Sequence, residues 1–164
     1  MAAGLVFTLL LGLSFGLWDG ADAECHLRVP TRIDCPAGWS FDGDRCFIVF
    51  NIPKSWIAAE KSCLLLGAHL ASFRTTEEYL IITHLIRKKF KYDVSTWVGA
   101  FDAVKEGRWM WSDGTGLCTR VWSLNQPKND GGNEHCMVVN LDGKEHVSDV
   151  ECHQKLPYVC AKPL

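Results

Sequence analysis

The residues best suited to chemistry lie in one stretch, Asn125–Cys136, with the sequence NQPKNDGGNEHC. Gln126 and Lys128 flank a proline, and Glu134 follows eight residues after Gln126. A cis bond before Pro127 would turn both flanking side chains to the same side. Amide and carboxylate oxygens are typical ligands of a hard cation such as Ca²⁺, whereas lysine offers three donors and no acceptor. The stretch therefore predicts a binding loop that carries an ammonium where a metal site would need an oxygen.

The remaining chemistry-bearing residues favour binding over catalysis. His135, His146 and His153 have no Cys, Asp or Ser partner at a spacing typical of a catalytic group, so we interpret them as exposed loop histidines. The G-x-S-x-G pattern at Gly12–Gly16 lies inside an apolar leader, without the strand–turn–helix setting that a serine hydrolase requires. We therefore expect that the protein is not an enzyme.

The first residues predict export from the cell. The run from Leu5 to Leu17, LVFTLLLGLSFGL, is apolar and uncharged, but it is shorter than the roughly 20 residues that span a bilayer. Small residues at Ala21 and Ala23 follow at the positions that a signal peptidase reads. We expect residues 1–23 to be a signal peptide. Residues 24–164 are then a secreted, extracellular single domain with a short N-terminal extension and no membrane insertion.

The charge balance argues against a nucleic-acid partner. The chain has 17 basic and 19 acidic residues, and removing Asp19 and Asp22 with the leader leaves equal numbers of both. A neutral domain is not expected to attract polyanions from a distance. The basic cluster Arg87–Lys91, RKKFK, is typical of a solvated helix end.

The cysteines predict disulfides rather than a structural zinc site. All eight follow the leader: Cys25, Cys35, Cys46, Cys63, Cys118, Cys136, Cys152 and Cys160. An even number in a secreted chain is typical of disulfide bonding, and none of them shows the C-x₂₋₄-C spacing of zinc sites. Spacing alone leaves 105 pairings open.

Two helices are predicted in the first half of the chain. We expect Ser55 to cap a helix that runs to Leu66 and stops at Gly67. Thr75 and Glu78 form a capping-box pattern that opens a second helix, which ends in a basic last turn. The apolar stripe of this second helix is Tyr79, Ile82, Leu85 and Ile86.

Short β-prone runs separated by Gly, Asn and Asp fill most of the remainder. They are RCFIVF (45–50), TWVGAF (96–101), GRWMWSDG (107–114), CMVVN (136–140), HVSDV (146–150) and LPYVC (156–160). These runs predict an α+β fold in which two helices pack on antiparallel strands. The stretch between Trp111 and Cys136 has little regular periodicity, and a loop of that length in a compact domain is usually functional.

Seven ordered motifs resemble the C-type lectin-like domain family. They are CPAGW (35–39), RCF (45–47), SWIAAEKSC (55–63), HLASF (69–73), WVGA (97–100), WMWSDG (109–114) and YVC (158–160). The resemblance spans Cys35–Ala161 and is strongest to fish lectins of the nattectin and ladderlectin kind, which are similar in turn to type II antifreeze proteins. It implies a double-loop fold, stapled by disulfides, in which the sheet and helices carry a long loop that binds sugar through calcium.

The resemblance also implies roles for cysteines and tryptophans. It implies the disulfides Cys35–Cys46, Cys63–Cys160 and Cys136–Cys152, and a core position for Trp39, Trp56, Trp97, Trp109 and Trp111. Cys25 and Cys118 are left over. They could pair within the chain, or they could link two chains in a disulfide-bonded homodimer.

By the same resemblance, the calcium ligands fall on Gln126, Lys128, Glu134, Ser148 and Asp149. The spacing is kept, but Lys128 has no oxygen and Ser148 is shorter than the usual asparagine. If calcium binds, its side-chain ligands are Gln126, Glu134 and Asp149; we favour no metal cofactor. In one hypothesis the Lys128 ammonium pairs with Glu134 and Asp149 and replaces the ion. In the alternative the site has lost its function and Lys128 points into solvent.

The expected ligand is galactose or lactose, because the family's Gln-Pro-Asp pattern goes with galactose and QPK shares its glutamine. The expected sugar-binding residues are Gln126, Lys128, Asn129, Glu134, Ser148 and Asp149, with Trp122 stacking on the sugar. The leading hypothesis is a secreted, calcium-independent lectin that agglutinates microbes or serves innate defence by binding surface glycans. The alternatives are a protein-binding module without sugar binding, and an ice binder like the type II antifreeze proteins.

Overall fold

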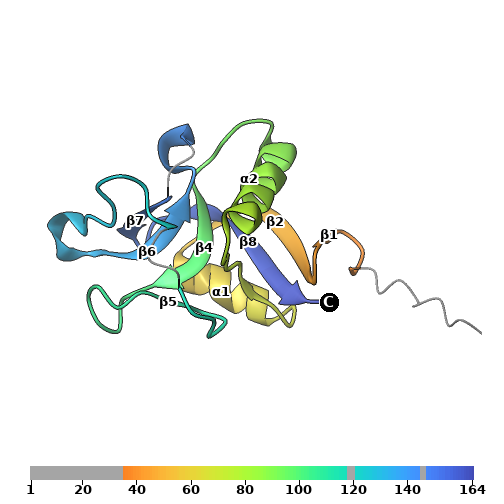
Figure 1. The fold of residues 1–164 in the computed structure, drawn as a ribbon, viewed down its shortest axis with the longest axis horizontal. Coiled ribbons are helices and arrows are strands. Elements are labelled where there is room, and N and C mark those ends of the chain that lie inside the picture. Colours follow the sequence, from red (N-terminus) through yellow and green to blue (C-terminus); the bar gives the residue numbers. More distant parts are fainter. Residues whose placement is uncertain (1–34, 118–120, 145–146) are drawn as a thin grey trace, which may run out of the picture. The chain divides into compact units, whose positions relative to one another are not determined.

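A computed structural model of the chain describes residues 35–117, 121–144 and 147–164 (Figure 1). The predicted signal peptide, Cys25 and Cys118 lie outside the described residues. The elements are β1 (Ser40–Asp42), β2 (Arg45–Lys54), α1 (Trp56–Leu64), β3 (His69–Leu70), α2 (Thr76–Phe90), β4 (Thr96–Phe101), β5 (Met110–Trp111), β6 (Glu134–Val139), β7 (Val147–Glu151) and β8 (Leu156–Pro163). The predicted α+β class and the two helices are thus confirmed.

The sheet has the order β1-β2-β8-β4-β6-β7, with β3 paired to β8 and β5 paired to β4. It differs from the expected antiparallel arrangement at one pairing, because β4 and β8 run parallel with Trp97 opposite Tyr158. The last strand returns from the end of the chain and lies between β2 and β4. A pairing between strands so far apart in the sequence leaves no local pattern, so the β-prone runs could not show whether these two strands are parallel or antiparallel.

Helix α1 begins after Ser55 as predicted, but the Ser55 side chain makes no capping hydrogen bond. The helix ends earlier than predicted, at Leu64. The Gly67 N–H donates to the carbonyl of Leu64 and the Ala68 N–H donates to that of Cys63, with Gly67 at φ 65°. Glycine adopts this left-handed conformation without a Cβ penalty, which explains why the chain turns away from the helix at Gly67, after the last helical residue Leu64.

Helix α2 has the predicted capping pattern with one change. The Glu78 N–H donates to the Thr75 side chain at 3.3 Å, while the Glu78 carboxylate accepts from the N–H of Arg74 rather than of Thr75. Of the predicted stripe, Ile82 and Ile86 are fully buried and Tyr79 and Leu85 are half-buried.

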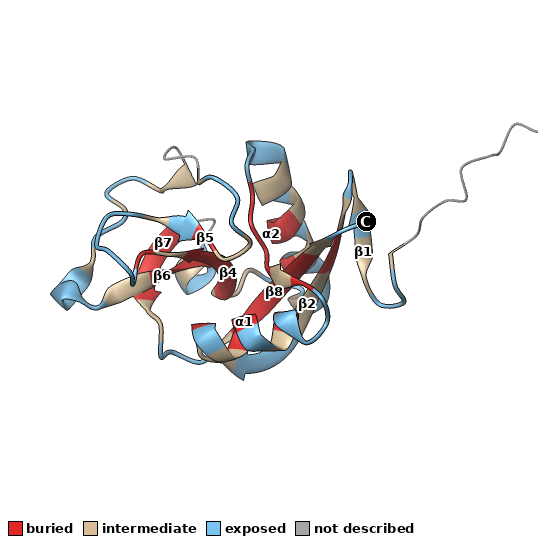
Figure 2. Cartoon of the chain, turned by 90° about the horizontal axis from the view of Figure 1, so that it is seen from below, coloured by how far each residue is buried: buried red, intermediate tan, exposed pale blue. Residues whose placement is uncertain are grey.

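The core forms two clusters on the two faces of the sheet, and Figure 2 shows that much of the central strands is buried. Successive side chains of a strand point to opposite faces, and β4 illustrates this: Trp97 packs in the cluster with α1, and Val98 packs in the cluster with α2. Trp56, Trp97 and Trp111 are buried core residues, whereas Trp39 and Trp109 are half-buried.

The three disulfides implied by the resemblance are all present. Cys35–Cys46 ties the start of the described chain to β2, Cys63–Cys160 ties α1 to β8, and Cys136–Cys152 ties β6 to the residue after β7. Each native bridge in a small secreted domain stabilises the fold by about 2–5 kcal/mol.

A buried carboxylate joins α1 to the centre of the fold. Glu60 is 6% exposed, and its Oε2 accepts from the Leu70 N–H at 2.7 Å and from the Ser112 hydroxyl at 3.1 Å. Its Oε1 lies 2.6 Å from Nδ1 of His69. Gly99 packs at the same junction, where an added Cβ would lie 2.6 Å from the carbonyl oxygen of Leu70. The junction is therefore both polar and tightly packed.

We expect Glu60→Ala to lower the free energy of unfolding by about 2–4 kcal/mol, because it leaves the Leu70 N–H and the Ser112 hydroxyl buried without an acceptor. The control is Lys61→Ala, an exposed neighbour on the same helix, which should change stability by less than about 0.5 kcal/mol. Urea unfolding with the disulfides intact measures both variants. Equal losses in the two variants would contradict the role given to Glu60.

Candidate functional site

The candidate binding loop is the segment 123–133, which leads into β6, and its first residue is bonded to strand β7. The Val147 N–H donates to the Ser123 hydroxyl at 2.8 Å, and the Ser123 N–H donates to the Val147 carbonyl at 3.3 Å. The Gln126 N–H then donates to the Ser123 carbonyl at 3.0 Å and turns the chain. The Gln126–Pro127 bond is cis, as the proline pattern suggested.

The centre of the loop is held by the carboxylate of Asp149 in β7. Asp149 is 2% exposed, its Oδ1 accepts from the Lys128 N–H at 2.9 Å, and its Oδ2 accepts from the Asn129 N–H at 2.7 Å. A buried charge is costly unless hydrogen bonds satisfy it, and bonds to an ionised acceptor are stronger than neutral ones. Two consecutive backbone amides of the loop therefore stabilise this carboxylate.

The end of the loop closes on Glu134. The Asp130 N–H donates to Glu134 Oε2 at 2.9 Å, and the Glu134 N–H donates to Asn129 Oδ1 at 3.0 Å. Asn129 has φ 49°, a left-handed conformation that asparagine adopts more readily than most residues. Asn129, Glu134 and Asp149 thus form one hydrogen-bonded group with the loop backbone.

The Lys128 ammonium does not take the place that one hypothesis gave it. Lys128 is exposed, and among the described residues no ion pair within 4.0 Å joins it to Glu134 or Asp149. Its backbone N–H, not its side chain, contacts Asp149. The exposed side chain agrees with the alternative hypothesis, in which Lys128 points into solvent.

Glu134 lies in an environment that disfavours its charge. Partial burial is the largest cause that raises the pKa of the Glu134 carboxyl, and the Asp149 and Asp130 charges act in the same direction. The Asp130 N–H and the Lys128 charge oppose this shift only in part, so the pKa stays above the usual value for glutamate.

Three predicted site residues lie outside this hydrogen-bonded group. Gln126 is half-buried, and its Oε1 is buried with no hydrogen-bond partner among the described residues. Ser148 is 1% exposed and lies opposite Val138 in the sheet. Trp122 is half-buried with its ring edge-on to Trp109, at 4.6 Å between centroids.

This donor set does not suit a calcium ion. Calcium takes 6–8 oxygen ligands, several of them anionic. Both oxygens of Asp149 already accept backbone amides, Lys128 offers no oxygen, and Ser148 is buried away from the loop hydrogen bonds. Of the five ligand positions that the resemblance gives, Lys128 lacks an oxygen, Ser148 is buried and each Asp149 oxygen already accepts one amide, so the set falls short of a calcium site.

The structure brings His135 next to two acidic residues, Asp102 and Glu106, which the sequence analysis had not connected with it. His135 Nδ1 lies 3.0 Å from Asp102 Oδ1 and 3.4 Å from Glu106 Oε2, and Asp102 is 1% exposed. The interpretation of His135 as an exposed loop histidine is therefore wrong, because the β4–β6 pairing brings Asp102 beside it. Exposed His153 agrees with that interpretation, and His146 lies outside the described residues.

Within the described part of the chain, Asp102, Glu106 and His135 form a group whose ligand atoms lie within 4.8 Å of one another. One imidazole nitrogen and two carboxylate oxygens suit Zn²⁺ better than calcium. The signal that could have found this group is the four-residue spacing of Asp102 and Glu106 in the turn after β4.

No helix among the described residues is long and apolar enough to cross a membrane.

The sequence and fold match known proteins. Residues 52–162 match the family described as "Lectin C-type domain". The chain is 38% identical to the galactose-specific lectin nattectin of Thalassophryne nattereri over all of both chains. It is 36% identical to ladderlectin of Oncorhynchus mykiss, over 82% of this chain and 70% of that one. The crystal structure of a calcium-independent type II antifreeze protein has a TM-score of 0.70 at 32% identity, over 79% of this chain and 95% of that one.

We expect Asp149→Asn to weaken the loop, because an amide has one acceptor oxygen and leaves either the Lys128 or the Asn129 N–H without a partner. Stability should fall by about 1–3 kcal/mol, and the orphaned amide should exchange with solvent roughly 10–100-fold faster. Hydrogen exchange followed by NMR measures this effect. The exposed neighbour Asp130→Asn is the control, and unchanged protection of both amides in Asp149→Asn would contradict the arrangement.

A second prediction concerns pH and Glu134. Because folding raises its pKa, ionisation of Glu134 opposes folding, and stability is lost as pH rises through the folded pKa. Glu134→Gln keeps an acceptor for the Asp130 N–H without the charge. It should therefore be more stable than the parent at pH 7, by less than about 0.5 kcal/mol because solvent screens the group. The advantage should disappear in urea titrations below pH 4.5, the ordinary pKa of a glutamate carboxyl.

Glu77 supplies the matched control of opposite sign. A hydrogen bond from the Glu77 backbone N–H is the largest cause that lowers the pKa of the Glu77 carboxyl, and a hydrogen bond with the Thr75 side chain is the next. The Glu77 charge therefore contributes stability that is lost as pH falls. Glu77→Gln should therefore lower stability at pH 7. A Glu134→Gln variant that loses stability at pH 7, as Glu77→Gln does, would refute the environment described for Glu134.

Proposed function

Because this chain belongs to the C-type lectin domain family, as its motifs predicted, we propose that it is a secreted, calcium-independent lectin for galactose or lactose. The observation that carries the proposal is the binding loop, which the Asp149 carboxylate holds in place through the Lys128 and Asn129 amides. In this arrangement the chain's own hydrogen bonds shape the loop without a cation. The relative named a galactose-specific lectin supports the choice of sugar.

The sugar would bind by direct hydrogen bonds at the loop. Gln126 is half-buried, and its Oε1 has no partner among the described residues, so this oxygen would accept from a sugar hydroxyl once the side chain turns it toward solvent. The exposed Lys128 ammonium can donate to sugar oxygens, and Asn129 and Glu134 lie beside it. Asp149 would act from beneath by holding the loop backbone, and buried Ser148 lies next to it in β7.

Trp122 would contribute only the part of its ring that Trp109 leaves uncovered. The Trp122 side chain is half-buried and packs against the core beside Trp109, so only the exposed part of its ring is left for a sugar. Sugar C–H groups pack on exposed aromatic surface of this kind. We therefore retain Trp122 as a stacking residue in the proposed site.

A site of a few hydrogen bonds binds weakly, because a neutral bond contributes only about 0.5–1.5 kcal/mol net and a bond to a charged group about 1.5–3 kcal/mol. Multivalency would raise the avidity for a surface that carries many copies of a glycan. A homodimer linked through Cys25 or Cys118 would supply two sites per molecule. Agglutination or opsonisation of microbes in innate defence is the role that such a protein would serve, and it requires binding rather than catalysis.

We expect the protein to stay on a lactose column in EDTA and to elute with free lactose, because no cation takes part in the proposed contacts. Gln126→Ala should elute earlier than the parent, since it removes the buried acceptor. Leu124→Ala is the matched control, because this side chain is 91% exposed two residues away and should leave retention unchanged. Elution by EDTA alone would contradict the calcium-independent proposal.

Absence of retention in both EDTA and calcium would reject sugar binding as a whole. The chain would then be a protein-binding module, or an ice binder like the antifreeze protein to which its fold is similar. Thermal hysteresis separates these two outcomes. The charged and exposed Lys128 and Asp130 make the loop a poor ice-binding surface.

A further inference from the structure

Among the described residues, β1 covers only the first part of the outer edge of β2. Strand β1 pairs with β2 only from Arg45 to Phe47, and β8 lies on the other side. In the part of the chain that the structure describes, no strand pairs with the outer edge from Ile48 to Ile52. Unpaired backbone groups of this kind are a template for a strand from another molecule.

The turn between β1 and β2 fixes which backbone groups face outward. Asp42 pairs with Arg45 across the two-residue turn Gly43–Asp44, with Gly43 at φ 61°. In such a hairpin the flanking residues exchange both hydrogen bonds, and the outward direction then recurs at every second residue. Val49 therefore presents its N–H and C=O at the open edge, before the register shift that follows Phe50.

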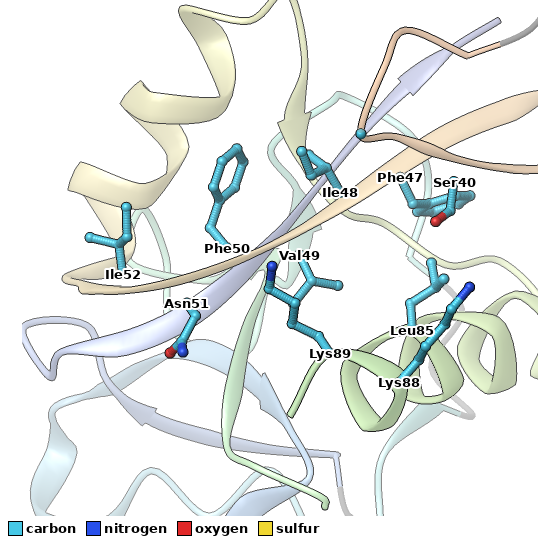
Figure 3. A pocket seen from close by; sticks show the side chains of 11 residues that line it. Ser40, Phe47, Ile48, Val49, Phe50, Asn51, Ile52, Leu85, Lys88 and Lys89 are labelled. Atoms are coloured by element: carbon cyan, nitrogen blue, oxygen red, sulfur yellow. The ribbon is translucent and has the colours of Figure 1, made fainter. Parts of the chain in front are cut away.

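A groove of about 610 Å³ runs between this edge and helix α2 (Figure 3). Val49 from β2 and Leu85 from α2 face each other across it, and Ser40 lies near one end. Ile52, near the other end, is 57% exposed. The groove thus offers apolar contacts directly beside the open backbone groups.

Two lysines give the groove a positive rim. Lys88 and Lys89 line it from the last turn of α2, and both are exposed. Neither ammonium forms an ion pair within 4.0 Å with a described residue, whereas neighbouring Arg87 pairs with Asp93 at 2.7 Å. The basic cluster, which the sequence indicated to be a solvated helix end, therefore places two cations at the rim of an apolar groove, without an ion-pair partner among the described residues.

The groove and the binding loop that precedes β6 lie at opposite ends of the sheet. β2 is next to the β1 end, whereas the loop is bound to β7 at the other end, as Figure 1 shows. A ligand at one site would leave the other open.

We propose that the open edge of β2 docks an extended acidic peptide segment of a partner protein. The segment adds as a strand beside Val49, with main-chain hydrogen bonds giving affinity. Its acidic side chains alternate along the face toward Lys88 and Lys89, and its apolar side chains lie on the opposite face beside Ile52. Six residues would span about 20 Å, which is sufficient to cover the edge from Ile48 to Ile52.

The probe is an acetylated, fluorescein-labelled hexapeptide that alternates glutamate and valine, titrated with the secreted protein and followed by fluorescence anisotropy. We expect saturable binding that falls roughly tenfold or more in the double variant Lys88→Glu with Lys89→Glu. The matched control is Lys105→Glu with Lys144→Glu, which makes the same change in net charge at exposed positions away from the groove. This control should leave binding within about twofold.

Peptide modification tests the strand geometry without changing the protein. N-methylation of one alternate set of peptide residues should abolish binding, and methylation of the other set should leave it, because only one edge of the peptide faces β2. Absence of binding by the secreted chain, equal loss in both lysine double variants, or indifference to both methylation patterns would overturn the proposal. Saturating lactose should not change peptide binding, so this result stands or falls independently of the lectin function.

Discussion

One buried carboxylate determines the conformation of the candidate binding loop. Asp149 is held in β7, with almost no exposure to water, and a charge in that position must be hydrogen-bonded. The loop supplies the donors from its own backbone, at Lys128 and Asn129. The contacts of Ser123 with β7 and of Glu134 with Asn129 and Asp130 then set the path of the chain on either side. A loop of this kind can be ordered without an ion, at the cost of the oxygens that an ion would use.

The two ends of the sheet are used differently. At the β7 end, the binding loop forms hydrogen bonds with the Val147 backbone and the Asp149 side chain of β7. These bonds hold the loop so that polar side chains face solvent. At the β2 end, no described strand pairs with the edge beyond the short strand β1, and the groove beside it carries Lys88 and Lys89 on its rim. Strand β8 joins the two ends, because it pairs with β2 and β4 and is bonded to α1 through Cys63–Cys160. The same sheet therefore carries the proposed glycan site at one end and the proposed peptide site at the other.

The sequence predicted features that depend on local patterns. Both helices, the capping residue Thr75 and the glycine stop at Gly67 follow from neighbouring residues, and the three disulfides followed from the family resemblance. Features that depend on distant residues were missed or wrong. The parallel β4–β8 pairing and the contact of His135 with Asp102 arise only when strands far apart in sequence meet. For the Lys128 side chain the sequence left two directions open, toward the carboxylates and toward solvent, because the backbone that positions it is held by the distant Asp149.

The central claim is that backbone amides, and not a cation, satisfy Asp149. The most direct measurement is a calcium titration of ¹⁵N-labelled protein in which the amide signals of Lys128 and Asn129 are followed by NMR. The account predicts that both signals keep their chemical shifts and their slow exchange with solvent at every calcium concentration. A saturable shift of both signals, accompanied by faster exchange, would show that the ion displaces the amides from the carboxylate and would contradict the account.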